Sequence, residues 1–348
     1  MSEEKKIKLG ISIGDINGIG CEVVLKTFKD QRMLEFCTPV LFASSKIVSQ
    51  QKQDLGLGLN FHGVSSADRS SDNKFNVVGV WKETAEIKYG QSTKQAGALA
   101  IRSLKAAVMA LKQGEIDVLV TAPINKSNIQ SDEFNFPGHT DYLARELDGD
   151  SLMFMVTPEL KVGLLTDHLA VKDVPDSIDA ELIARKVGII DKSLKMDFGI
   201  RRPKIALLGI NPHSGDNGVI GKEDDEVLRP AIEALSKKGL LVFGPYAADS
   251  FFGSGTHLQF DAVLAAYHDQ GLIPFKTLSF GKGVNFTAGL SHVRTSPDHG
   301  TAYEIAGQGV ADESSFKEAV FTAIDIFRNR EQYKELTRQP LKAQKPKK

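Results

Sequence analysis

The sequence predicts an α/β fold around a parallel sheet, and three observations support this expectation. Short apolar runs rich in β-branched residues alternate with longer amphipathic segments, which is the pattern of βαβ units. The chain has 348 residues, enough for two lobes or one large α/β unit. Its composition, 41% hydrophobic and 25% charged, is ordinary for a globular protein. Helices are therefore expected on both faces of the sheet.

The elements follow one another along the chain with few interruptions. Six segments are expected to be buried strands: 7–14, 37–44, 116–123, 161–168, 204–213 and 260–269. Four segments are expected to be helices: 94–113, 177–197, 223–238 and 315–328. The segment 62–76 is rich in Ser, Asp and Asn and is expected to be an exposed loop. Because no break in composition marks a linker, we expect two lobes between which the chain crosses more than once.

Charge and cysteine content exclude several classes of protein. The net charge is −1 with both signs interspersed, which argues against nucleic-acid binding. Two cysteines are too few for a disulfide framework and fit a reducing compartment. The first 15 residues lack the apolar core of a signal peptide, and no apolar run is long enough to span a bilayer. A cytoplasmic protein without membrane partners is expected.

Three of the predicted strands finish on a histidine. "KVGLLTDH" ends at His168, "KIALLGINPH" at His213, and "FDAVLAAYHD" carries His268 at its end. Ligands of parallel α/β sheets bind at the carboxyl ends of the strands. Three neutral imidazoles there suit Zn²⁺, Co²⁺ or a similar cation with an open coordination position. Any one of these histidines alone would more simply cap a turn, but three at matching positions favour the metal site.

Polar residues that suit an anion are expected at the same edge. Lys126 follows the strand at 116–123, and His139-Thr140 stands behind a glycine, just before a helix-like run. A capping Thr with an incidental His remains the alternative there. The glycine-rich stretch 275–302 adds three more residues that suit a phosphate: Lys276, Asn285 and Arg294.

An early glycine-rich segment, "GDINGIGCE" (14–22), follows the first strand. Its spacing is not that of the dinucleotide fingerprint G-x-G-x-x-G. A tight turn from strand to helix explains the glycines at least as well.

Longer motifs carry a resemblance to a known family. They are "VTAPINK", "FPGHTDYLA", "DHLAVKDVP", "NPHSGDNGVIGKED", "AYHDQGLIPFK" and "GVNFTAGLSHVRTSPDHGTAYEIAGQG". In this order, from about residue 8 to about residue 328, the chain resembles the 4-hydroxythreonine-4-phosphate dehydrogenases of vitamin B6 biosynthesis. The resemblance implies a two-lobed isocitrate/isopropylmalate-dehydrogenase-like fold with the active site in the cleft between the lobes. It departs from the family's common pattern at several positions, among them Asp167, where Thr is common.

The resemblance also implies an activity and a set of site residues. The activity is NAD- or NADP-dependent oxidation of 4-phosphohydroxy-L-threonine, followed by decarboxylation to 3-amino-2-oxopropyl phosphate. One divalent metal ion (Zn, Mg or Co) would be held by His168, His213 and His268, across the interface of a homodimer. The substrate residues would be His139, Thr140, Lys276, Asn285 and Arg294. By similarity to the isopropylmalate dehydrogenases, the dinucleotide would be held by Asp298, His299, Gly300, Thr301, Ala302 and Asp312.

The lobes and the general base complete the predicted enzyme. Residues 1–125 and 270–348 are expected to form the first lobe, and residues 126–269 the second lobe with the dimer interface. Asp249, Asp269 and Lys126 are all candidates for the group that removes the hydroxyl proton.

Three other functions remain open from the sequence. The nearest is the oxidation of a phosphorylated sugar acid such as 4-phosphothreonate or 4-phosphoerythronate. An acyltransferase is the second, because phosphate acetyltransferases share the general fold. A non-catalytic binding protein is the third, and the number of polar groups at one sheet edge argues against it.

Overall fold

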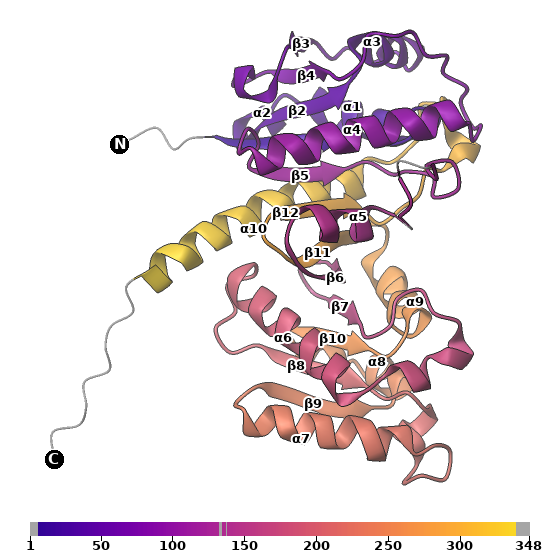
Figure 1. Ribbon diagram of the computed structural model, residues 1–348, viewed down its shortest axis with the longest axis vertical. Coiled ribbons are helices and arrows are strands. Elements are labelled where there is room, and N and C mark those ends of the chain that lie inside the picture. Colours follow the sequence, from indigo (N-terminus) through magenta and orange to yellow (C-terminus); the bar gives the residue numbers. More distant parts are fainter. Residues whose placement is uncertain (1–5, 132–133, 137, 339–348) are drawn as a thin grey trace, which may run out of the picture.

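The computed structural model describes residues 6–131, 134–136 and 138–338. One twelve-stranded sheet runs through both lobes, in the order β3-β4-β2-β1-β5-β12-β11-β6-β7-β10-β8-β9. The strands are β1 (Ile7–Ser12), β2 (Cys37–Ala43), β3 (Phe61–Val64), β4 (Phe75–Gly79), β5 (Val118–Thr121), β6 (Gly149–Val156), β7 (Lys161–Leu164), β8 (Lys204–Leu208), β9 (Leu241–Tyr246), β10 (Ala262–Ala265), β11 (Val284–Leu290) and β12 (Val293–Pro297). The α/β class and the two-lobed shape predicted from the sequence are confirmed (Figure 1).

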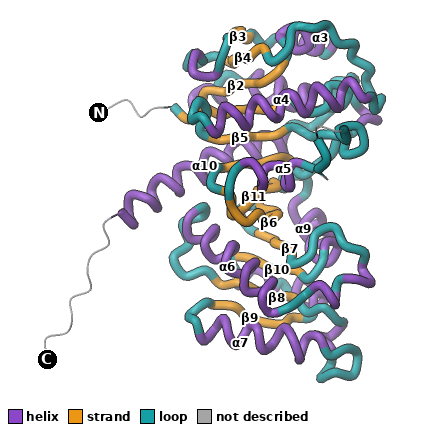
Figure 2. The backbone as a smooth tube through the Cα atoms, in the orientation of Figure 1, coloured by secondary structure: helices purple, strands orange, loops and turns teal. Residues whose placement is uncertain are grey.

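Helices cover both faces of the sheet, as the alternation of elements predicts (Figure 2). The buried side chains of α1, α3, α6, α7 and α10 pack on one face, and those of α4, α5, α8 and α9 pack on the other. The main helices are α1 (Gly20–Lys29), α2 (Met33–Phe36), α3 (Ser45–Asp54), α4 (Lys94–Lys112), α5 (His139–Glu146), α6 (Ala180–Met196), α7 (Arg229–Lys237), α8 (Ala248–Gly253), α9 (His268–Ser279) and α10 (Ser314–Arg338). Among the described helices, none is long and apolar enough to cross a membrane.

The prediction of a parallel sheet is wrong for the centre of the sheet. The outer strands of both halves pair in parallel, but β11 is antiparallel to β12 and to β6, and β6 is antiparallel to β7. The strands concerned lie in segments without the clean apolar runs of the predicted strands. Gly289, with φ of +85°, bends β11 at a bulge where a side chain would meet the carbonyl oxygen of Asp150. Glycines of this kind obscured the strand pattern.

The six predicted strands and four predicted helices are present, with two further corrections. The segment 62–76 is not a plain loop, because β3 and the start of β4 lie in it. Those strands lie at the edge of the sheet, where polar residues are common and the apolar signal is weak. His268 begins the helix α9, and His213 lies in a short 3₁₀ turn after β8.

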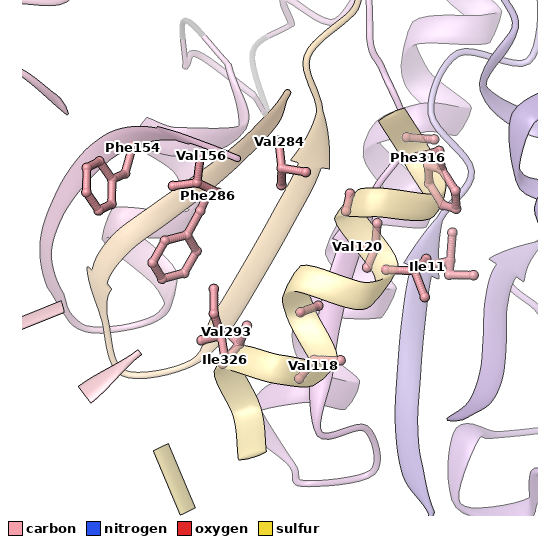
Figure 3. Close-up of a cluster of buried hydrophobic side chains, with 14 of the residues drawn as sticks. Ile11, Val118, Val120, Phe154, Val156, Val284, Phe286, Val293, Phe316 and Ile326 are labelled. Carbon is pink, nitrogen blue, oxygen red and sulfur yellow. The ribbon is translucent and has the colours of Figure 1, made fainter. Parts of the chain in front are cut away.

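One continuous apolar core joins the lobes. Figure 3 shows its middle, where Phe316 and Ile326 of α10 pack beside Val118 and Val120 of β5, with β11 and β6 alongside. The same cluster continues to α6 and α7 in the other lobe. The lobes are therefore joined by a packed core, which holds the strand ends of the two halves in a fixed relation.

A glycine fixes how closely α4 approaches the turn that carries Lys126. A Cβ atom on Gly97 would lie 2.1 Å from the carbonyl oxygen of Asn128. Gly97→Ala should therefore destabilise the protein by about 1–3 kcal/mol, the cost of overpacking, although alanine is the better helix former. Gly188 in the middle of α6 has open space around it. As a matched control, Gly188→Ala should stabilise by about 0.5–1 kcal/mol. Urea unfolding of both variants tests this, and shifts of the same sign would contradict it.

Candidate active site

A cavity of about 290 Å³ lies between the lobes. Strand ends and loops from both halves of the sheet line it. It brings together most of the residues singled out from the sequence: Lys126, His139, Thr140, His168, His268, Lys276, Asn285, Arg294, Asp298, His299 and Gly300. His213, Asp249, Asp269, Thr301, Ala302 and Asp312 do not line it.

The guanidinium of Arg294 is the most deeply buried charge of the cavity. Arg294 lies on β12 and is only 2% exposed. Its Nε and Nη2 donate to Thr121 Oγ1 (3.1 and 2.6 Å), and its Nη1 donates to Thr287 Oγ1 (3.1 Å). Among the described residues no carboxylate lies within ion-pair distance of it, and burial lowers the pKa of Arg294 to about 9. A buried cation held only by hydroxyl groups is costly unless an anion joins it.

His139 and Asn285 present unpaired polar atoms beside this cation. His139 begins α5, and both its Nε2 and the Oδ1 of Asn285 are buried without a partner among the described residues. Burial holds the pKa of His139 well below its usual range, and the charges of Arg294 and Lys126 add to the effect. His139 is therefore neutral at pH 7 and can donate one hydrogen bond from Nε2 if the proton lies there.

Two carboxylates also line the cavity, and one of them is neutralised within the chain. Lys276 Nζ lies 3.1 Å from Asp298 Oδ1. Burial raises the pKa of Asp298, whereas the charge and hydrogen bond of Lys276 act in the opposite direction. Asp141, in the first turn of α5, is the other carboxylate, and the sequence reasoning did not single it out.

Two of the three predicted metal ligands lie together. The ring centroids of His168 and His268 are 5.9 Å apart. The Nδ1 of His268 lies 2.7 Å from Asp269 Oδ1, an arrangement that fixes the proton on Nδ1 and leaves Nε2 free to bind a metal. Asp269 therefore orients His268.

His213 does not join this pair. It is exposed in the turn after β8 and has φ of +53°, a left-handed conformation that Ser214 shares. Among the described residues no group of three or more His, Cys, Asp or Glu side chains could hold a metal ion. Within one chain, the three histidines thus do not form a single site.

The remaining predicted residues lie outside the cavity. Asp249 is exposed on α8, and Asp312 accepts a hydrogen bond from the backbone N–H of Ser314 at the start of α10. Thr301 and Ala302 face the glycine-rich turn 14–20 instead, since Ile19 N–H donates to the Thr301 carbonyl (3.0 Å). The sequence reasoning separated these two segments, and the structure places them side by side.

The chain is similar to known proteins over most of its length. The family model of the pyridoxal phosphate biosynthetic protein PdxA matches residues 35–323. The chain belongs to this family. A 4-hydroxythreonine-4-phosphate dehydrogenase of Bacteroides thetaiotaomicron is 47% identical to it over 98% of this chain and 94% of the relative. The crystal structure of the Klebsiella pneumoniae enzyme of that name matches with a TM-score of 0.81 at 30% identity, covering 94% of this chain and 99% of that one.

A more distant relative carries a different name. A protein of Oceanobacillus iheyensis, provisionally named a D-threonate 4-phosphate dehydrogenase, is 34% identical over 92% of this chain and 98% of its own length. The family predicted from the sequence motifs is confirmed, and so is its place among dehydrogenases of pyridoxal phosphate biosynthesis.

The neutral state of His139 makes stability depend on pH. In the unfolded chain this ring takes up a proton as the pH falls through about 6.5, whereas the folded chain keeps it neutral to a lower pH. The unfolded state then binds more protons than the folded state. The contribution of neutral His139 to the free energy of unfolding is therefore complete above pH 6.5 and is lost below it, by up to about 1.4 kcal/mol per pH unit. His139→Gln should flatten this part of the curve. Urea unfolding from pH 7.5 to 5.0 measures it, and an unchanged slope would show that His139 protonates equally in both states.

Proposed function

We propose that the protein oxidises the secondary hydroxyl of 4-phosphohydroxy-L-threonine with NAD or NADP. The β-keto acid formed loses CO₂ to give 3-amino-2-oxopropyl phosphate, a precursor of pyridoxal phosphate. The family and the name of the Bacteroides relative support this substrate over 4-phosphothreonate or 4-phosphoerythronate. The observation that carries the proposal is the buried guanidinium of Arg294, which lines the cavity and lacks an anionic partner among the described residues.

The phosphate of the substrate would bind at this guanidinium. Thr121 and Thr287 fix its plane, so that its remaining donors have a defined direction. Neutral His139, Thr140 and Asn285 line the same cavity and can add hydrogen bonds without adding charge. Lys276 supplies the second cation. Held in this way, the phosphate would anchor the substrate so that its hydroxyl carbon lies at a fixed place in the cavity.

His168 and His268 fit a divalent cation. A metal bonded at about 2.1 Å to one nitrogen of each ring would hold the ring centroids roughly 5–6 Å apart, and the observed separation is 5.9 Å. The bond between His268 and Asp269 leaves the ligating nitrogen free. When bound, a cation such as Zn, Mg or Co lowers the pKa of a coordinated hydroxyl and stabilises the oxygen charge that develops. We assign the third ligand to His213 of a second subunit, which makes the active enzyme a homodimer.

The dinucleotide would lie against the loop 298–302 and near Asp312. His299 Nε2 is buried and has no hydrogen-bond partner in the described part of the chain. Gly300 is exposed, with open space where a side chain would stand. This rim of the cavity fits the approach of a nicotinamide to the substrate. When bound, the dinucleotide accepts the hydride.

Lys126 is the proposed general base. Of the three candidates, it alone lines the cavity within this chain, whereas Asp269 is engaged with His268 and Asp249 is exposed elsewhere on α8. We place the reaction in the cytoplasm, which agrees with two cysteines that are free and buried.

The phosphate assignment is tested by substrate and enzyme variants together. Arg294→Ala should lower kcat/KM for 4-phosphohydroxy-L-threonine. The expected loss of transition-state stabilisation is about 2–5 kcal/mol, the cost of losing one partner of a buried charge pair. The unphosphorylated 4-hydroxythreonine should be a poor substrate that is nearly indifferent to the change. Thr121→Val, which removes only the acceptor that orients the guanidinium, should act in the same direction with a smaller loss. If Arg294→Ala lowered kcat/KM by the same factor for both substrates, Arg294 would not bind the phosphate.

The shared metal site is tested by mixing subunits. His168→Ala, His213→Ala and His268→Ala should each lose the bound metal, measured by elemental analysis of the purified protein. Exchange of subunits between the His168→Ala and His213→Ala variants should restore about one quarter of the parental metal content, because half of the dimers would hold one intact site. The matched control is a mixture of His168→Ala with His268→Ala, which should restore none. Equal recovery in both mixtures, or full metal content in the single variants, would contradict the arrangement.

A further inference from the structure

The loop that we assign to the dinucleotide turns on a strained residue. Ala302 has φ of +42° and ψ of +56°, a left-handed conformation that is unfavourable for a residue with a Cβ atom. Such a conformation persists only where neighbouring contacts hold it. His299 and Gly300, which line the cavity, stand directly before this turn.

The contacts on both sides of Ala302 come from the glycine-rich turn after β1. Before it, the carbonyl of Thr301 accepts from Ile19 N–H at 3.0 Å. After it, the hydroxyl of Tyr303 donates to Asp15 Oδ2 at 2.8 Å. Gly18 permits this approach, because a Cβ atom there would lie 2.7 Å from the Thr301 oxygen. Gly18 of this glycine-rich turn thus serves a close contact with the loop.

Asp15 is an unusual residue to find at this position. It is fully buried, and among the described residues no Lys, Arg or His lies within ion-pair distance of it. Its carboxylate instead accepts from Asn17 N–H (2.9 Å), Asn128 Nδ2 (2.8 Å) and the Tyr303 hydroxyl. Burial, with the bond and charge of Asp15, raises the pKa of Tyr303 to about 12, so the hydroxyl remains a donor. The carboxylate of Asp15 therefore connects three segments: the turn 14–20, the segment that carries Lys126, and the loop.

A second attachment holds the far end of the loop. Lys26 of α1 donates to the carbonyls of Gly309 (2.9 Å) and Ala311 (2.6 Å), and Glu22 accepts from Ala311 N–H (2.9 Å). Glu22 and Lys26 form an ion pair at 2.9 Å. With this end fixed independently, Asp15 and Ile19 supply the contacts from the glycine-rich turn that flank Ala302.

We propose that Asp15 is a positioning residue for the dinucleotide, which acts by holding Tyr303 and with it the strained turn at Ala302. This inference rests on the proposed function, since it presupposes that the dinucleotide binds at the loop. A carboxylate suits the role because its bonds to donors are stronger than those of a neutral acceptor. Loss of the bond would let Ala302 relax to a negative φ and displace His299 and Gly300 from the rim of the cavity.

The central experiment removes only the hydroxyl group. Tyr303→Phe should weaken the binding of NADH or NADPH, whichever the parent protein binds, by roughly tenfold, the range for a hydrogen bond to a charged acceptor. The Kd is measured by fluorescence titration of the purified protein. The matched control is Tyr89→Phe, which removes a similar bond from a tyrosine hydroxyl to Asp54 Oδ2 (2.9 Å) and keeps the ring. That variant should bind the dinucleotide as the parent does.

Two further measurements separate positioning from general stability. Asp15→Asn replaces the charged acceptor with a weaker neutral one and should weaken dinucleotide binding. The double variant with Tyr303→Phe should bind no more weakly than the worse single variant, because both changes act on the bond between Asp15 and Tyr303. Hydrogen exchange should accelerate at residues 299–306 in Tyr303→Phe, without a change in the affinity for inorganic phosphate. Additive losses, or weaker phosphate binding to the same degree, would overturn the inference in favour of a merely structural role.

One more variant separates this inference from the proposed function. Gly300→Val adds a side chain into open space, so the fold should tolerate it while a bound dinucleotide should not. If the parent binds neither NADH nor NADPH, or if Gly300→Val binds as the parent does, the proposed cofactor site fails and the inference fails with it. If Gly300→Val weakens binding and Tyr303→Phe does not, only the role of Asp15 is overturned.

Discussion

The antiparallel strands at the centre of the sheet are the constraint on which the site depends. From β5 through β12, β11 and β6 to β7 the strand direction reverses three times, so β7 and β10 run opposite to β5 in the order of the sheet. In a flat sheet, their carboxyl ends would lie at opposite edges. Each step between strands adds about 20–25° of twist, and residues after β5, β7 and β10 line one cavity. Twist and packing of α10 against these strands thus bring together Lys126, His168 and His268.

The chemistry of the cavity follows from burying the guanidinium of Arg294, which among the described residues has no carboxylate within ion-pair distance. If a carboxylate faced Arg294, it would repel a phosphate, and the hydroxyls of Thr121 and Thr287 orient the guanidinium without adding charge. His139, next to it, is kept neutral by burial. The free energy that this arrangement costs the empty protein is returned when an anion binds.

An element of the fold could be predicted from the sequence where its residues show a clear hydrophobic pattern. The six predicted strands are apolar and β-branched, so burial on both faces made them visible. The strands β6 and β11 carry polar residues and a glycine bulge, because they line the cavity or bend beside it. His168 and His268 could be singled out because each follows a visible apolar strand, whereas Arg294 was singled out as a cation in a glycine-rich stretch and its strand β12 was not predicted. Asp15 and Tyr303 could not be singled out, since they are 288 positions apart and only the fold brings them together.

The ion pair between Lys276 and Asp298 connects the two proposed binding regions. Asp298 begins the loop assigned to the dinucleotide, and its carboxylate lines the cavity in which we propose that the phosphate binds. Lys276 neutralises this charge, so Asp298 does not repel a phosphate held by Arg294. A substrate phosphate that draws Lys276 toward itself would loosen its bond to Asp298, while Asp15 and Lys26 still hold the loop farther along. The loop is thus fixed at Tyr303 and Ala311, and at Asp298 its ion pair with Lys276 would couple it to the proposed phosphate site.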